Sequence, residues 1–160
     1  MARSYYIEQA DTDDAELIAS IYRSNPEFSK FQLGTNWVST DFVLGDMVEM
    51  WRAGFRSVLI REGEGTLVGF CDYKRGETVY LSLLVVDGAF QHQGMGAEIY
   101  QLLEQEFRRE KAGAVIVDVP NRKDNVVVQF WKKQGFIPLE TVTMKGNCQT
   151  YEAVVMRKVI

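Results

Sequence analysis

The chain is poor in cysteine, proline and histidine, and these scarcities limit what it can be. Its 160 residues include 2 cysteines, 3 prolines and 1 histidine. The cysteines, Cys71 and Cys148, lie far apart and lack C-x-x-C spacing, so neither a disulfide framework nor a zinc site is indicated. We therefore expect no metal, and we interpret both cysteines as reduced packing residues.

Long hydrophobic runs and clusters of basic residues are also missing. No run reaches the roughly 18 apolar residues of a membrane-spanning helix, and the first residues, MARSYYIEQADTDD, lack the apolar core of a signal peptide. We expect a cytoplasmic protein without a membrane partner. The formal net charge of −4, with no long Lys/Arg cluster, argues against a nucleic-acid partner and favours a cationic one.

The length and the hydrophobic periodicity predict a single domain over residues 1–160 that alternates strands with helices. Predicted strands cover residues 5–10, 55–61, 66–73, 79–86, 114–119, 136–144 and 149–159, and predicted helices cover 11–25, 39–54, 94–111 and 126–134. Residues 27–37 are irregular in pattern but rich in large apolar side chains, so we expect them to pack against something. A homodimer is left open.

Two continuous apolar runs, residues 79–86 and 114–119, are typical of strands that are buried on both faces. The helix predicted between them makes one crossover unit, so the two strands should be parallel neighbours. The turn at residues 62–65 and the strands on either side of it predict an antiparallel hairpin before the unit.

The loop between the first buried strand and the helix contains Gly94 and Gly96. The first N–H groups of a helix lack partners and its N-terminus is positive, so this turn can seat a phosphate or pyrophosphate. No Lys or Ser/Thr follows Gly96, which excludes a Walker loop, and Ile99 stands where a dinucleotide fingerprint needs a third glycine. A helix start that uses glycine only for a tight turn remains the alternative.

Two motifs resemble the GNAT superfamily of N-acetyltransferases. Gln91-x-x-Gly94-x-Gly96 is similar to the family's Gln/Arg-x-x-Gly-x-Gly/Ala, and residues 124–136 are similar to its Asn-x-x-Ala-x-x-(Phe/Leu)-Tyr-x-x-x-Gly-Phe segment. The resemblance extends from about residue 79 to residue 136. It implies an α/β fold with a mixed, mostly antiparallel sheet of six or seven strands, a central parallel strand pair and helices on both faces.

The resemblance also implies an activity and a co-substrate. An acetyl group would pass from acetyl-CoA to a primary amine of a small, cationic acceptor by direct attack on the thioester, without a metal. Two alternatives stay open: acetylation of a protein or peptide amine, and a non-catalytic domain that senses acyl-CoA.

The resemblance implies cofactor contacts from the first buried strand, the glycine loop and the helix after residue 125. These residues are Leu84, Val85, Val86, Gln91, His92, Gln93, Gly94, Met95, Gly96, Ala97, Asn125 and Trp131. For His92 the alternative is a solvated polar residue of the loop without a phosphate contact. The backbone N–H of Leu84 would also hold the thioester oxygen, which makes Leu84 a catalytic residue. Asp124 is the alternative to Asn125, one residue earlier.

The chain departs from the family pattern at its two proton-transfer positions. Tyr80 stands where some members carry a glutamate base, and Trp131 stands where the family's tyrosine acid is expected. A tyrosine is a poor base at neutral pH, so Tyr80 and Ser82 are predicted to position a water that removes the proton, and the alternative is that both are simply half-buried strand residues. An indole N–H is too weak an acid, so Trp131 is predicted to pack.

The resemblance implies that residues 28–51 wall the acceptor pocket, although simple core filling is the alternative for any one of them. Asp41, Asp46 and Glu49 lie in this stretch. Their negative charge favours a cationic amine over a neutral or anionic acceptor.

Overall fold

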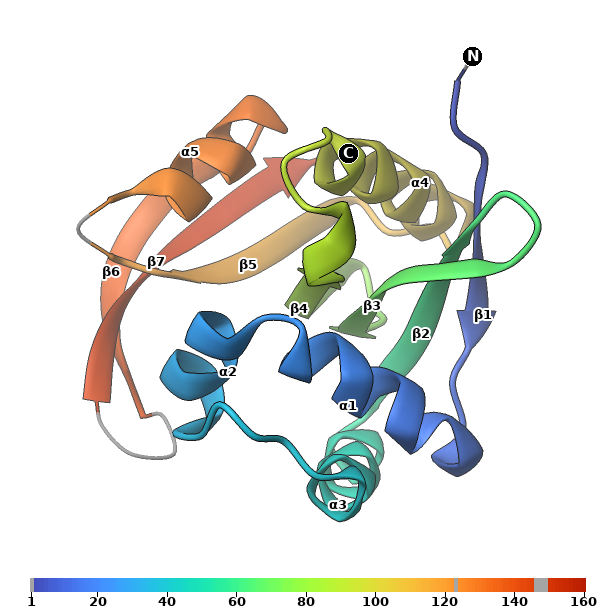
Figure 1. Cartoon of the computed structure of the whole chain (residues 1–160). Coiled ribbons are helices and arrows are strands. Elements are labelled where there is room, and N and C mark those ends of the chain that lie inside the picture. Colours follow the sequence, from blue (N-terminus) through green and yellow to red (C-terminus); the bar gives the residue numbers. More distant parts are fainter. Residues whose placement is uncertain (1, 123, 146–149) are drawn as a thin grey trace.

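The backbone forms one seven-stranded sheet with helices on both of its faces (Figure 1). The computed structural model describes residues 2–122, 124–145 and 150–160, so Cys148 and the predicted strand start at residue 149 lie outside the described residues. The strands are β1 (Tyr5–Gln9), β2 (Phe55–Glu62), β3 (Thr66–Lys74), β4 (Thr78–Val86), β5 (Ala114–Pro120), β6 (Ile137–Lys145) and β7 (Thr150–Val159). The helices are α1 (Ala15–Arg23), α2 (Pro26–Leu33), α3 (Thr40–Arg52), α4 (Met95–Arg109) and α5 (Val126–Lys133), with short 3-10 turns at Thr12–Asp14 and Gly88–Phe90.

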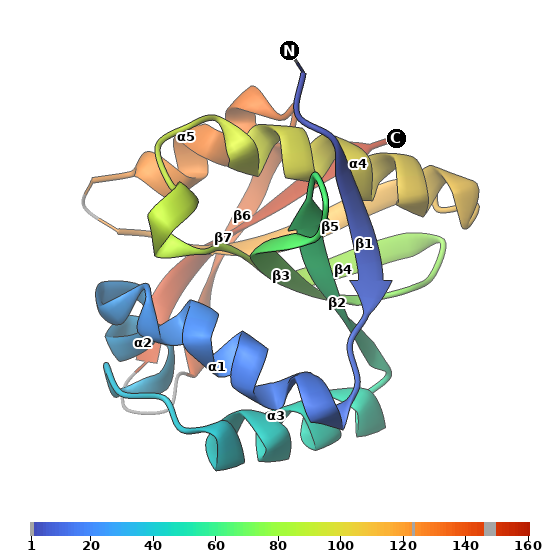
Figure 2. The same ribbon diagram turned by 45° about the vertical axis from the view of Figure 1, so that its right-hand side comes forward.

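The strand order is β1-β2-β3-β4-β5-β7-β6, and β4–β5 is the parallel pair in this otherwise antiparallel sheet. Figure 2 shows α4 and α5 on one face of the sheet and α1, α2 and α3 on the other. Each face has its own buried cluster, one under α4 and α5 and one under α1 and α3. The expected α/β fold, with its parallel pair and helices on both faces, is confirmed.

The stretch from Pro26 to Leu33 differs from the sequence prediction, because it forms a helix where an irregular segment was expected. Pro26, which follows the predicted helix of residues 11–25, occupies the start of α2, where a missing N–H costs nothing and the fixed φ suits a helix. Gly34 then ends α2 with φ 78°. The prediction failed because the apolar residues of this helix are not confined to one stripe.

The parallel pairing of β4 with β5 stops partway along both strands. Its last paired residues are Leu81 and Val117. One residue later Ser82 forms a β-bulge, since Asp72 pairs with Leu83 and Tyr73 pairs with Leu81. Beyond Leu81, β4 remains paired with β3 alone, and β5 continues beside β7. A gap therefore opens in the middle of the sheet.

The end of β4 is fastened to the end of α1. Asn25 donates from Nδ2 to the carbonyl oxygen of Val86 at 3.1 Å, and the N–H of Gly88 donates to Ser24 Oγ at 2.9 Å. The approach at Gly88 is close, since a Cβ atom there would lie 2.2 Å from the carbonyl oxygen of Ser24. The loop that leads into α4 therefore starts from a rigid junction.

The space around Gly88, at this junction, and around Gly45, in α3, predicts opposite effects of an alanine substitution on stability. Gly88→Ala should lower the free energy of unfolding by about 1–3 kcal/mol, because the methyl group would overlap backbone that cannot easily move. Gly45→Ala, inside α3 with nothing within 4 Å of the added Cβ, should raise it by about 0.5–1 kcal/mol. Urea unfolding measures both changes. A Gly88→Ala protein as stable as the wild type would contradict the close approach.

Candidate active site

The turn before α4 has the geometry of an anion site. Gly94 has φ 77° and precedes Met95, the first residue of the helix. The N–H groups of Met95, Gly96 and Ala97 lie in the first turn of α4, so they have no partner within the helix. A Cβ atom on Gly94 would meet no atom within 4 Å, so the space above the turn is open. Phosphate oxygens suit these donors and the positive end of the helix.

A hollow of about 480 Å³ extends from this turn between α4 and α5. Of the residues predicted to bind the cofactor, those that line it are Leu84, Val86, Gln91, His92, Gly94, Met95, Gly96, Ala97 and Trp131. The sequence reasoning did not name its other lining residues, which are Phe90, Val127, Phe130, Lys133 and Gln134. Lys133 is exposed in the last turn of α5 and adds positive charge to the hollow.

Three predicted cofactor residues lie elsewhere among the described residues. Val85 is buried in the cluster under α1 and α3, on the opposite face of the sheet. Gln93 donates from its side chain to the carbonyl oxygen of Ala89 at 3.4 Å. Asn125 precedes α5 with φ 55°, and the carboxylate of Asp124 accepts a bond from Val126 N–H at 3.3 Å. The cofactor roles of Val85, Gln93 and Asn125 remain predictions.

Gln91 combines a lining position with a structural contact. Its side-chain amide donates to the carbonyl oxygen of Val86 at 3.0 Å and to Oδ1 of Asn25. Gln91 thus joins the junction between α1 and β4. Its side chain holds the start of the loop in place while the backbone after it turns toward α4.

Backbone geometry decides which N–H groups of β4 face the gap. Asp87 N–H donates to Val68 on β3 at 2.8 Å, and the carbonyl of Val85 points at Gly69 on β3, 2.5 Å from where a Cβ would stand. Because these groups alternate along a strand, the N–H groups of Leu84 and Val86 point away from β3. They face the gap that β5 leaves, as the predicted role of Leu84 requires.

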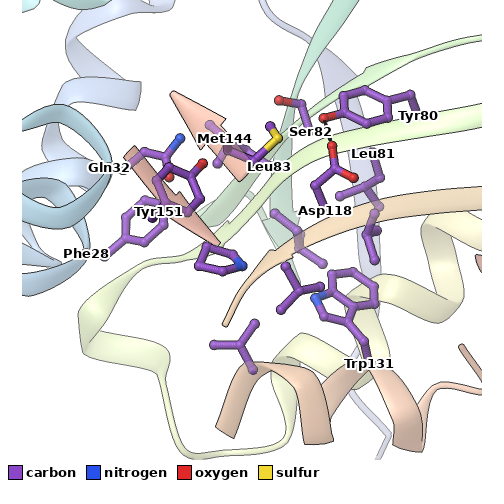
Figure 3. A pocket seen from close by; sticks show the side chains of 15 residues that line it. Phe28, Gln32, Tyr80, Leu81, Ser82, Leu83, Asp118, Trp131, Met144 and Tyr151 are labelled. Atoms are coloured by element: carbon purple, nitrogen blue, oxygen red, sulfur yellow. Dashed lines mark hydrogen bonds between the residues drawn. The ribbon is translucent and has the colours of Figure 1, made fainter. Parts of the chain in front are cut away.

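A second hollow, of about 160 Å³, passes through the gap and shares Leu84, Val127 and Trp131 with the first. On the α2 side it is lined by Tyr80 and Ser82, as well as by residues from α2, β5 and β7 that include Gln32, Asp118 and Tyr151 (Figure 3). A ligand in the first hollow and one in the second would therefore meet beside Leu84.

Asp118 is the residue in this hollow that sequence reasoning missed. The hydroxyl of Tyr80 donates to Asp118 Oδ2 (Figure 3). Burial, followed by this hydrogen bond and the charge of Asp118, raises the pKa of Tyr80, so its hydroxyl is a donor and not a base. The sequence feature that could have identified Asp118 as a candidate site residue is its position as the acidic residue of the otherwise apolar run 114–119.

Trp131 stands where the two hollows join. Its side chain is 7% exposed and makes edge-to-face contacts with Tyr100, Phe130 and Phe136, whose ring centroids lie 5.0–5.4 Å away. These contacts hold the indole as a wall of the channel.

A third hollow, also of about 160 Å³, continues from the second and shares Gln32, Ser82, Leu83 and Tyr151 with it. It adds Asp46 from α3 and Tyr22 from α1. Burial raises the pKa of Asp46. Burial, together with the charges of Asp72 and Asp46, raises the pKa of Tyr22 well above its usual value, so its hydroxyl lies in a negative environment.

Within the described part of the chain, no helix is long and apolar enough to cross a membrane, and no group of three or more His, Cys, Asp or Glu side chains could hold a metal ion.

Three solved structures share the fold over nearly all of both chains. An acetyltransferase from Thermus thermophilus superposes with a TM-score of 0.78 at 18% identity, covering 98% of this chain and 97% of that one. A ribosomal-protein-alanine N-acetyltransferase from Brucella melitensis gives 0.71 at 18% identity, covering 97% and 99%. PaiA N-acetyltransferase from Thermoplasma acidophilum, in complex with coenzyme A, gives 0.68 at 16% identity, covering 98% and 99%. No curated protein matches the chain in sequence.

The first hollow begins at an anion site and joins the second, so the two could hold a long anionic cofactor and a second substrate, and the family comparison defines the class of protein. The model of the acetyltransferase (GNAT) domain family matches residues 36–159. The chain therefore belongs to the GNAT N-acetyltransferases, which confirms the resemblance seen in its motifs. Family membership supports acetyl-CoA-dependent acetyl transfer and leaves the acceptor open.

The open turn at Gly94 predicts a selective loss of coenzyme binding in Gly94→Ala. The added methyl group meets no protein atom, but it narrows the space in which a phosphate would sit, so CoA affinity should fall at least about tenfold, or 1.4 kcal/mol. Gly63→Ala is the matched control, because Gly63 also has positive φ, 62°, and open space around it, in a hairpin turn. Calorimetric titration with CoA that gives equal affinity for both variants would contradict the phosphate site.

The packing of Trp131 predicts that its indole N–H is dispensable. Trp131→Phe keeps an aromatic wall, and a thiolate leaves readily near neutral pH, so kcat should stay within about tenfold of the wild type. Steady-state kinetics with acetyl-CoA measures this ratio. A loss of more than about a hundredfold, in a variant that folds and binds CoA normally, would mean that the N–H takes part in the chemistry.

Proposed function

We propose that residues 1–160 act as one domain that transfers the acetyl group of acetyl-CoA to a primary amine of a small, cationic acceptor by direct attack on the thioester. The observation that carries the proposal is the continuity of the three hollows. They lead from the open turn at Gly94, past Leu84 in the gap, to the carboxylate of Asp46.

The gap orients the reaction. With the pyrophosphate at the start of α4, the pantetheine arm follows the first hollow and its thioester reaches the gap. The N–H of Leu84 then donates to the thioester oxygen and stabilises the oxyanion that forms during attack. A single donor of this kind is worth about 2.7–4 kcal/mol in the transition state, and because it belongs to the backbone, side-chain mutagenesis at Leu84 would largely miss it.

Charge supports a cationic acceptor. Of the three acidic residues noted in the sequence, α3 turns Asp46 into the third hollow, whereas Asp41 and Glu49 are exposed. Glu49 pairs at the surface with Arg52 at 3.5 Å. Asp72, 4% exposed, lies close enough to Asp46 for the two charges to interact, but burial raises the pKa of Asp72 to about 7, so Asp72 is only partly ionised at neutral pH and Asp46 is the main negative group of the hollow. Lys145, at the end of β6, lines the same hollow and adds a positive charge on that side. The negative charge is therefore concentrated on the opposite side, at α3.

The enclosure of the hollows supports a small molecule over a protein. Phe31 on α2 meets Tyr151 on β7 with ring centroids 5.2 Å apart, and Arg122 stacks over Phe31 at 5.0 Å. The second hollow lies beside this contact, with Tyr151 among its lining residues and room for only about 160 Å³. A folded protein surface would have to separate α2 from β7 to enter.

A turnover screen tests the proposal. Release of free thiol from acetyl-CoA would be followed with diamines, amino acids, aminoglycosides and peptides, including one that begins with alanine, the residue named for the Brucella melitensis neighbour. Diamines should be acetylated fastest. Faster turnover of neutral or peptide acceptors would reject a small cationic acceptor, and no turnover with any amine would favour an acyl-CoA sensor.

The position of Asp46 predicts a change in acceptor affinity. Asp46→Asn should raise KM for 1,3-diaminopropane about tenfold, because a charge-assisted bond of about 1.5–3 kcal/mol is lost. Glu49→Gln removes the same charge from the exposed face of α3 and should leave KM within about twofold. Rising salt should raise KM of the wild type, and so should a fall in pH through the raised pKa of Asp46, which removes its charge. Equal effects of the two variants would contradict a cation site at Asp46.

A further inference from the structure

Asp118 occupies the position at which β5 leaves β4. Val117 is the last β5 residue paired with β4, so Asp118 is the first beyond the split. Val117 and Val119 are buried under α4 and α5, and alternation along the strand places Asp118 on the opposite face, toward α2. Figure 3 shows its carboxylate directed toward Tyr80 at the side of the second hollow. Asp118 is thus a carboxylate at the place where an acceptor would meet the thioester.

The partners of this carboxylate leave it free to accept a further proton donor. Tyr80 on β4 donates one hydrogen bond. Tyr151 on β7 lies close enough for the charge of Asp118 to raise its pKa, and Gln32 on α2 lines the same hollow. Lys145 lines the adjoining hollow, and among the described residues no ion pair involves Asp118. A carboxylate offers about four acceptor positions, so most of those on Asp118 remain available.

We propose that Asp118 accepts the proton that the acceptor ammonium must lose before it can attack, and that Tyr80 is the positioning residue that holds the carboxylate. This inference rests on the proposed function. A protonated amine has no free lone pair, so a nearby base that takes its first proton allows the nitrogen to attack the carbonyl carbon. The sequence offered no such base, because Tyr80 occupies the position expected for it.

The proton balance is complete without another reactant. The N–C bond forms as the carbonyl electrons move to the oxygen beside Leu84 N–H, and the C–S bond breaks when the intermediate collapses. The first amine proton goes to Asp118 and from there to solvent. The second leaves the nitrogen on collapse and reaches the thiolate, so the products are the amide, CoA thiol and one released proton.

The hydroxyl of Tyr80 has a definite part in this arrangement. Since it stays protonated, it donates to one oxygen of Asp118 and fixes the orientation of the carboxylate. Its ring is held edge-on by Phe55, with centroids 5.7 Å apart. The other carboxylate oxygen therefore remains available to the amine, or to a water between them, in a hollow that Ser82 also lines.

Asp118→Asn tests the base directly. The amide still accepts a bond from Tyr80, so the variant should fold and bind CoA with wild-type affinity by calorimetry. With 1,3-diaminopropane as acceptor, kcat should fall about a hundredfold or more. With 2,2-difluoro-1,3-diaminopropane, which has nearly the same shape but weakly basic amines, much of the acceptor is already neutral. The loss caused by Asp118→Asn should then shrink to less than about tenfold.

Tyr80→Phe tests the positioning role. The ring and its contact with Phe55 remain, but the carboxylate loses the hydrogen bond that fixes its orientation. With 1,3-diaminopropane kcat should therefore fall about tenfold while KM stays within about twofold, and with 2,2-difluoro-1,3-diaminopropane the fall in kcat should be smaller, a dependence on acceptor basicity that a purely structural role would not cause. Tyr6→Phe, at an exposed position on β1, is the control and should leave kcat unchanged with both diamines.

The outcomes separate the two proposals. If the wild type acetylates amines but Asp118→Asn keeps kcat within about threefold, or loses equally with both diamines, Asp118 is not the base. A Tyr80→Phe variant that keeps the wild-type kcat, or loses equally with both diamines, would reject the positioning role. If the wild type acetylates no amine, the proposed function fails, and the role of Asp118 fails with it.

Discussion

The parting of β4 from β5 after Leu81 and Val117 is the constraint on which the site depends. Parallel strands normally continue their hydrogen bonds, and unpaired backbone groups in a protein interior are costly. Here the bulge at Ser82 reverses the faces to which the odd-numbered side chains of β4 point. Val79 and Leu81 pack under α4, whereas Leu83 and Val85 pack under α1 and α3. The strand thereby leaves backbone donors facing a hollow, where a thioester can use them.

The two substrates would approach this gap from opposite faces of the sheet. The first hollow lies between α4 and α5 and begins at backbone N–H groups, so it suits an anionic cofactor. The third hollow lies toward α1 and α3 and carries Asp46, so it suits a cation. The hydrogen bonds that join the end of β4 to the end of α1, at Asn25 and Gly88, hold the first and third hollows in a fixed position relative to each other. This is because the loop that leads into α4 starts at the same junction.

The two departures from the family pattern have a common physical consequence. Tyr80 and Trp131 cannot serve as a base and an acid, and the structure surrounds each with contacts that suit other work: a hydrogen bond to Asp118 for the one and three aromatic rings for the other. In the proposed mechanism, proton removal belongs to Asp118 on the neighbouring strand, since residues of β4 and β5 line the same hollow. A base on either strand could serve such a site, because the sheet directs residues of both strands into the same hollow.

What the sequence determined by itself is local. The apolar runs of β4 and β5, the helix between them and the glycine turn before α4 depend on residues close together in the chain, so their order predicted the crossover unit, the fold and the place of the cofactor. Only the tertiary structure decided which side chains meet one another and which of them line the hollows. Asp118 could be seen as an acid in an apolar strand, but its meeting with Tyr80 requires the pairing of strands 38 residues apart. The helix at Pro26–Leu33 and the inward turn of Asp46 were likewise settled by packing, because a weak periodic pattern does not specify which side of a segment becomes buried.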